Sequence, residues 1–106
     1  MTPLHCAAMH GQGDVVRQLL AVGANIVALD NSRRTPLHWA ASHGHTGVVQ
    51  VLLSKEAYFT LEAREDYGRT PLHFAVALGN LEVVRILLDR GADKESKDKD
   101  GKAPLH

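Results

Sequence analysis

Histidine is the residue type in this chain that most invites a chemical role, because 106 residues contain seven copies of it. Neutral imidazole is a common zinc ligand, and two histidines four residues apart on one helix can share an ion. The seven are His5, His10, His38, His43, His45, His73 and His106. No two of them have that spacing, and no pair of cysteines accompanies them. We therefore expect neither a metal site nor a cofactor.

Other residue types that could catalyse a reaction lack the necessary neighbours. Cys6, the only cysteine, occupies the same place in a repeated pattern as Trp39 and Phe74, which indicates a partly buried spacer on a helix. The segment 11–13, Gly-Gln-Gly, is too short to cradle a phosphate and does not follow a strand. Carboxylates such as Glu82 lie on a helical face rich in arginine, which favours a solvated surface. We therefore predict that the protein is not an enzyme.

Composition narrows the classes of partner and the compartment. Lys and Arg total 12 and Asp and Glu total 12, so no basic excess is available to neutralise a row of phosphates. One cysteine excludes an internal disulfide and favours a reducing compartment. The longest apolar stretches, such as residues 74–78, are far too short to cross a bilayer, and the first residues do not resemble a signal peptide. We expect an intracellular protein, cytoplasmic or nuclear, that neither binds nucleic acid nor inserts into a membrane.

Internal repetition is the strongest signal in the sequence. The tetrapeptide Thr-Pro-Leu-His begins at Thr2, Thr35 and Thr70, and a degenerate copy begins at Ala103, so the intervals are 33, 35 and 33 residues. The agreement extends to other offsets, which carry Ala7, Ala40 and Ala75, then Gly11, Gly44 and Gly79, then paired valines and paired leucines. Agreement at so many offsets indicates copies of one structural unit.

These residues resemble the ankyrin repeat, whose pattern is Thr-Pro-Leu-His-x-Ala with a period of 33 residues. The resemblance covers essentially the whole chain and divides it into repeats 2–34, 35–69 and 70–102 and a partial repeat 103–106. It implies a mainly α fold, an α-solenoid of helix-turn-helix units joined by β-hairpin-like loops. It also implies that the histidine of the tetrapeptide is a structural residue whose hydrogen bonds tie neighbouring turns together.

Local helix chemistry points the same way. Each tetrapeptide offers a threonine N-cap followed by proline at the first helical position, where a missing N–H costs nothing. We expect the first helix of each unit to end near its glycine and the second to begin at His45 or Thr46 in the second unit and at Asn80 in the third. Gly23 and Gly91 stand where a left-handed residue ends a helix. Helices this short are marginal alone, so each unit must depend on its neighbours.

Some positions depart from the repeat. The second unit has two extra residues within 58–62, which we interpret either as a loop bulge whose Leu61 fills the core or as an aromatic contact made by Tyr58 and Phe59. Arg33 stands where the other hairpins have glycine, which predicts a different turn or a strained left-handed residue. Gly13 replaces the leucine found at position 81, so we expect the first unit to pack less well.

The resemblance implies that a partner protein binds a concave surface made of hairpin tips and first helices. Carried over by position, the surface comprises Met9, His10, Asn31, Ser32, Arg34, Ser42, His43, Asp66, Tyr67, Arg69, Ala77 and Leu78. Met, Tyr and Leu would be its apolar anchors, and Arg34 and Arg69 would bind carboxylates or backbone. On this interpretation, replacing Tyr67 and Arg69 by alanine weakens partner binding without changing the melting temperature.

Two other functions remain open: a structural spacer or scaffold segment of a larger protein, and a repeat sequence with no partner of its own. Neither end of the sequence has the polar face of a capping unit, so we expect a piece of a longer array. Exposed apolar ends would also favour head-to-tail stacking of copies.

Overall fold

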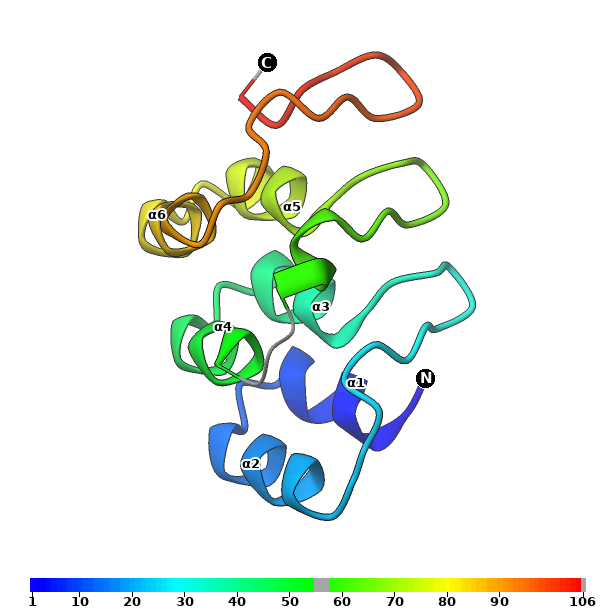
Figure 1. Ribbon diagram of the computed structural model, residues 1–106, viewed down its shortest axis with the longest axis vertical. Helices are drawn as coiled ribbons and strands as arrows, with labels where there is room; N and C mark the ends of the chain where they lie inside the picture. Colours follow the sequence, from blue (N-terminus) through cyan, green and yellow to red (C-terminus); the bar gives the residue numbers. More distant parts are fainter. Residues whose placement is uncertain (55–57, 106) are drawn as a thin grey trace.

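The computed structural model describes residues 1–54 and 58–105, with residues 58 and 59 described by their backbone alone. Figure 1 shows the helices as a ladder of pairs. The elements of the described part are α1 (Pro3–Met9), α2 (Gly13–Ala21), α3 (Pro36–Ser42), α4 (Thr46–Leu53), the 3₁₀-helix η1 (Tyr58–Glu62), α5 (Pro71–Leu78) and α6 (Leu81–Asp89). They contain no strand, so the mainly α class is confirmed for these residues.

The first helix of every unit begins at the tetrapeptide, as the sequence predicts. Thr2, Thr35 and Thr70 are extended N-caps whose hydroxyls accept a hydrogen bond from the backbone N–H of the histidine three residues on. The histidine ring in turn accepts from the threonine N–H, which completes a capping box. Two backbone donors that a helix start leaves unpaired are thus satisfied within four residues.

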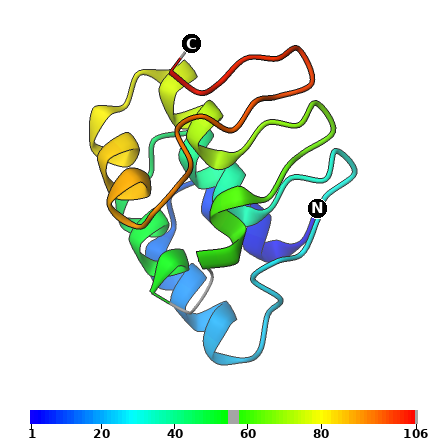
Figure 2. The same ribbon diagram turned by 45° about the horizontal axis from the view of Figure 1, so that its top comes forward.

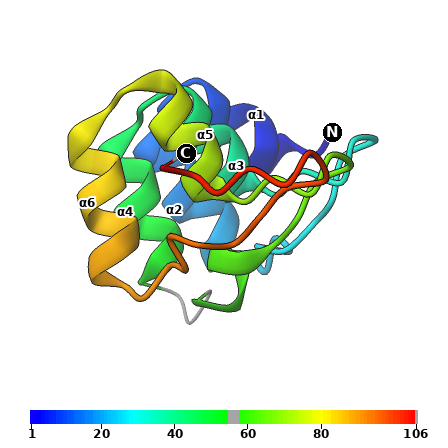
Figure 3. The same cartoon turned by 90° about the horizontal axis from the view of Figure 1, so that it is seen from above.

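The units stack along the longest axis of the molecule, which measures 38 × 27 × 22 Å. α1, α3 and α5 form one row, α2, α4 and α6 form a second, and each helix packs on its counterpart in the next unit (Figures 1 and 2). Seen from above, three hairpin loops extend from the first row on the side away from α2, α4 and α6 (Figure 3). This arrangement is the solenoid expected from the sequence.

The core runs through the stack because every unit contributes the same buried positions. Leu4, Leu37 and Leu72 are almost fully buried between the helix rows. α4 buries five of its residues, whereas α2 buries only Val16, because α4 has a helix of its own row on each side. The packing of each unit therefore depends on its neighbours, as expected for a one-dimensional array.

Two predictions about packing have different outcomes. Leu61 is only 4% exposed, which confirms that it fills the core despite the insertion. The Tyr58 and Phe59 side chains lie outside the described residues. The expectation that Gly13 weakens the first unit is wrong in its premise, because Leu81, its counterpart, is 80% exposed. That position begins the second helix on its outer side, so a leucine there buries little.

Helix ends and hairpin tips use the glycines that the repeat supplies. Gly23 and Gly91 adopt φ of 91° and 99° just after the second helices, as predicted. In the hairpins, Gly68 and Gly101 adopt φ of 76° and 79°, and Arg33 adopts φ of 63° at the same position. The strained left-handed residue expected at Arg33 is therefore present.

Replacing Arg33 by glycine should stabilise the protein. Relief of left-handed strain is worth about 1–2 kcal/mol, and the entropy of glycine in the unfolded chain offsets about half of it. We expect the free energy of unfolding in urea to rise by about 0.5–1 kcal/mol. Gly68→Ala is the matched opposite change, because its Cβ would stand 3.0 Å from the Lys99 backbone nitrogen at φ of +76°. A loss of stability in Arg33→Gly would contradict the strain argument.

Candidate protein-binding surface

The hairpins are built around an acidic residue at the start of each. The Asp30 carboxylate accepts from the N–H groups of Ser32 and Arg34 at 2.8 and 2.9 Å. Glu65 does the same for Tyr67 and Arg69 at 2.8 and 3.0 Å. Because the carboxylate gathers two N–H groups of the tip, the hairpin keeps its shape without a strand ladder.

The third hairpin repeats this design with Asp98, which accepts from Asp100 N–H and Lys102 N–H, both at 2.9 Å. These bonds lower the pKa of the Asp98 carboxyl, the bond from Lys102 most of all. For Asp30 and Glu65, burial raises the pKa, but the N–H groups of the tips and nearby side chains outweigh it and the net shift is downward. All three carboxylates are therefore ionised at neutral pH.

The hairpins are also joined to one another. The N–H of Asp66 donates to the carbonyl of Ser32 at 3.0 Å, and the N–H of Lys99 donates to the carbonyl of Tyr67 at 2.9 Å. The three tips therefore form one row along the stack, visible at the right of Figure 1. A partner would meet this row as a single surface.

The repeated histidines hold each helix pair to the hairpin that follows. The Nε2 atoms of His5, His38 and His73 lie 2.8, 2.9 and 2.9 Å from the carbonyl oxygens of Arg34, Arg69 and Lys102. Since Nδ1 accepts from the threonine N–H, the proton resides on Nε2 and is donated to the carbonyl. The structural role implied for these histidines is thus confirmed; His106 lies outside the described residues.

A second line of contacts joins the loops between paired helices. The ring of His45 bonds to the carbonyl of Met9 through Nε2 at 2.8 Å, and the Asn80 amide donates to the carbonyl of Gly44 at 3.3 Å. Asn80 also caps α6, as predicted. His45 occupies the N-cap position of α4 but makes no capping bond with its side chain. Gly11 makes this contact possible, since a Cβ there would lie 2.6 Å from the His45 ring.

Aromatic rings and guanidinium groups alternate along the row of hairpins, and we call this set the Arg–aromatic row. The Arg34 guanidinium lies 5.3 Å from the centroids of both Trp39 and Phe74. The Arg69 guanidinium lies 5.2 Å from Phe74 and 5.0 Å from Tyr67. These separations are within the range of cation–π attraction. The row therefore links two hairpins to the first helices α3 and α5.

Glu65 places a buried carboxylate next to both guanidinium groups of this row. The residue is only 3% exposed. Its carboxylate lies 3.3 and 3.4 Å from the Arg69 guanidinium and 3.8 Å from Arg34 Nε. Glu65 is not among the surface residues expected from the sequence, although the sequence contains a signal for it: an acidic residue precedes the basic residue by four positions in all three hairpins.

The predicted surface residues fall into groups of different accessibility. Asn31, Asp66 and Tyr67 are exposed at the tips, and Ser32 is half-buried. Arg34 and Arg69 are half-buried and lie against Glu65, Arg69 through two hydrogen bonds and Arg34 at 3.8 Å, so both are in part structural residues. Their contact with a partner stays a prediction. The ring of Tyr67 is 62% exposed and is the most accessible aromatic side chain that the structure describes.

The helix positions of the surface lie at the C-terminal ends of the first helices. His10, His43, Ala77 and Leu78 are exposed, and Met9 and Ser42 are half-buried. His43 and His45 stack with centroids 6.2 Å apart. Cys6, expected to be partly buried, is exposed. Its counterparts Trp39 and Phe74 are half-buried against the guanidinium groups of Arg34 and Arg69.

Two hollows open between the second and third hairpins. One, of about 380 Å³, is lined by Tyr67, Arg69, Asp98 and Asp100. The other, also about 380 Å³, extends over α5 and is lined by Arg69, His73, Val76, Ala77, Asp98, Lys102, Ala103 and Pro104. Within residues 1–54 and 58–105, no three His, Cys, Asp or Glu side chains converge in a way that could hold a metal ion.

Comparison with protein families agrees with this geometry. Residues 1–64 and 31–98 match the family described as ankyrin repeats in three copies. The chain belongs to the ankyrin-repeat family. Members of the family generally serve as protein-interaction modules. No helix in the described part of this ankyrin-repeat chain has the length and apolar character that spanning a membrane requires.

A curated relative shares one segment of this ankyrin-repeat chain. The transient receptor potential cation channel subfamily A member 1 of Drosophila melanogaster is 54% identical over 35 residues, which is 33% of this chain and 3% of the channel. The chain therefore matches only a small part of that protein, about one repeat in length.

Acid should weaken the ankyrin stack through His38. Burial lowers the pKa of His38 from 6.5 to about 4, although its bond to Arg69 and the nearby Glu65 act in the opposite direction. As the pH falls below 6.5, His38 takes up a proton in the unfolded chain, whereas in the folded chain it stays neutral until the pH approaches about 4. The folded state therefore has its full stability above the pKa that His38 has in the unfolded chain, and it loses stability as the pH falls to the pKa that His38 has in the folded chain.

From these two pKa values, we expect the free energy of unfolding to fall by about 2 kcal/mol between about pH 7 and about pH 5. Urea unfolding at each pH measures it, and the NMR titration of the His38 ring should have its midpoint near the folded pKa of about 4. A His38 ring that titrates at its ordinary pKa in the folded protein would contradict this account.

Arg69→Ala should destabilise the protein, contrary to the expectation from sequence. It leaves the buried Glu65 carboxylate without its nearest cation and removes packing from Phe74 and Tyr67. Because Glu65 keeps two backbone bonds and Arg34, we expect a loss of about 2–3 kcal/mol in urea unfolding.

Adding Glu65→Gln to Arg69→Ala should recover part of this loss, because it removes the buried carboxylate charge that has lost its nearest cation. The control is Arg17→Ala, which breaks an exposed pair with Asp14 at 2.9 Å and should cost under about 1 kcal/mol. Equal effects of Arg69→Ala and Arg17→Ala would argue against a structural role for the pair.

Proposed function

We propose that this chain binds a partner protein through the concave surface formed by the hairpin tips and the exposed ends of α1, α3 and α5. The observation that carries the proposal is the placement of exposed apolar side chains on that surface. Tyr67 at a tip and Leu78 at the end of α5 are 62% and 50% exposed. Exposed aromatic and apolar residues in a row with polar neighbours are typical of interaction surfaces.

The rigidity of this surface supports the proposal. The tips are joined by backbone bonds, held by buried histidines and braced by the Arg–aromatic row, so they lose little entropy when a partner binds. Arg34 and Arg69 shape the surface, and Tyr67, Leu78 and the exposed tip residues are available to contact the partner.

The second candidate function is that of a spacer or scaffold segment of a larger protein. It draws support from the fly cation channel, in which the matching segment is a small part of a long chain. On this proposal the hairpin row would contact other parts of the same protein. Self-stacking is a further possibility, supported by Val22 and Leu105, which are 82% and 56% exposed near opposite ends of the stack.

A double change on the concave surface, Tyr67→Ala with Leu78→Ala, tests the binding function. Proteins captured by the chain from a cell extract and identified by mass spectrometry should be depleted at least about tenfold by this variant, since each lost anchor costs about 1–2 kcal/mol. The melting temperature should stay nearly unchanged because both side chains are largely exposed.

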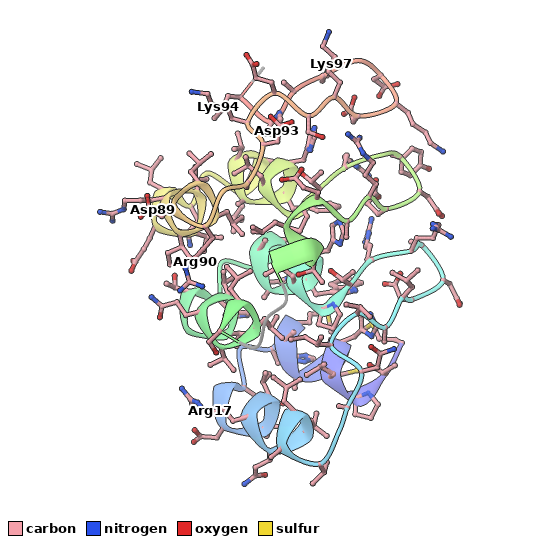
Figure 4. The ribbon with its side chains drawn as sticks, viewed as in Figure 1. Arg17, Asp89, Arg90, Asp93, Lys94 and Lys97 are labelled. Carbon is pink, nitrogen blue, oxygen red and sulfur yellow. The ribbon has the colours of Figure 1, made fainter. Side chains whose placement is uncertain are left out.

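The matched control is Arg17→Ala with Asp89→Ala, which leaves the net charge unchanged. Both side chains point outward from the row of α2, α4 and α6, on the side away from the hairpins (Figure 4). Capture that is lost equally in both variants, or in neither, would argue against binding through the concave surface. Sedimentation of each variant separates loss of binding from self-association.

A further inference from the structure

The Arg–aromatic row is closed at one end and open at the other. Phe74, in its interior, contacts two guanidinium groups, those of Arg34 and Arg69. Trp39 ends the row against the His43 ring at 5.8 Å, and its indole N–H donates to Asp30 at 2.8 Å. Tyr67, at the other end, contacts one guanidinium and leaves most of its ring exposed. The pattern of the row therefore lacks a cation at Tyr67.

The hollow beside Tyr67 has the charge that such a cation requires. Of its lining residues, Arg69 is paired with Glu65 at 3.3 Å, and the two acidic residues of the lining are Asp98 and Asp100. Asp98 is held in place because one of its oxygens accepts two backbone bonds. Of the nearby cations, Lys102 lines the neighbouring hollow over α5, and the Lys99 side chain lies against Gly68.

We propose that this hollow binds an arginine side chain of the partner protein, stacked on Tyr67 and hydrogen-bonded to Asp98 and Asp100. The inference rests on the proposed binding function and names the chemistry of one contact within it. Arginine fits better than lysine, because a planar guanidinium stacks on a ring while its edge donates to carboxylates. Arg69 already uses both kinds of contact, since it lies over the Tyr67 and Phe74 rings and donates to Glu65.

The test uses a short probe, so it needs no knowledge of the partner. N-acetyl-Gly-Arg-Gly-amide is titrated into the ¹⁵N-labelled protein, next to the same tripeptide with citrulline, which keeps the shape of arginine and removes its charge. We expect saturable shifts of the Tyr67, Asp98 and Asp100 amides, with a Kd on the order of millimolar. The citrulline peptide should bind at least about tenfold more weakly, and the lysine peptide should fall between the two.

Variants of the chain locate the site. Tyr67→Ala and Asp100→Asn should each weaken the arginine probe at least about threefold, and Tyr67→Phe should retain it because the ring remains. Ser32→Ala, the same tip position in the first hairpin, is the control and should bind the probe as the unchanged protein does. A melting temperature within about 2 °C of the parent value shows that a variant is folded.

The inference would be overturned if the citrulline peptide bound as tightly as the arginine peptide, or if the arginine peptide caused the same amide shifts in Tyr67→Ala as in the unchanged protein. It would also be overturned if the same shifts appeared when the protein concentration alone was raised, because the cation would then come from a second copy of the chain. The inference and the proposed function fail separately. Loss of probe binding with intact capture by the concave surface rejects only the arginine site. Probe binding without any captured protein rejects the partner function instead.

Discussion

The rest of this structure depends on the hydrogen bonds of a buried, neutral imidazole that lies between successive units. In each unit its Nδ1 accepts from the cap of the first helix and its Nε2 donates to the carbonyl that closes the following hairpin. One side chain thus links the start of a helix to a loop about 30 residues away. Helices of seven to nine residues cannot persist alone, so this link and the stacked leucines must act together.

The surface proposed for binding follows from that link. Because the histidines hold the hairpins in place, the tips can bond to one another, and the basic residues that end the first two hairpins, Arg34 and Arg69, lie over aromatic rings of the first helices. The guanidinium groups therefore belong to the structure as much as to the surface. Recognition is left to the side chains that the row does not use, of which Tyr67 is the largest.

Family membership and the structure address different questions about function. The family match accounts for the stack, the caps and the general use of such arrays in binding proteins. Specificity lies in positions that the fold leaves free, and in this chain those positions differ from hairpin to hairpin. Ser32, Tyr67 and Asp100 occupy one equivalent tip position and differ in size and charge, so the hollows beside them have different chemistry.

The sequence by itself determined the repeat, through the agreement between its copies, and also the threonine caps and the helix-ending glycines, because these depend on residues within a few positions of one another. It left two alternatives for Arg33, a different turn or a left-handed residue, and the structure has the second. Only the tertiary structure decided that Glu65 is buried between two arginines, that His45 reaches Met9 in the preceding unit, and that Cys6 and Leu81 are exposed. The contacts of Glu65 with Arg34 and of His45 with Met9 join residues 31 and 36 positions apart on neighbouring units. They depend on how closely the units stack and which side of each is covered, and a local pattern carries no record of either.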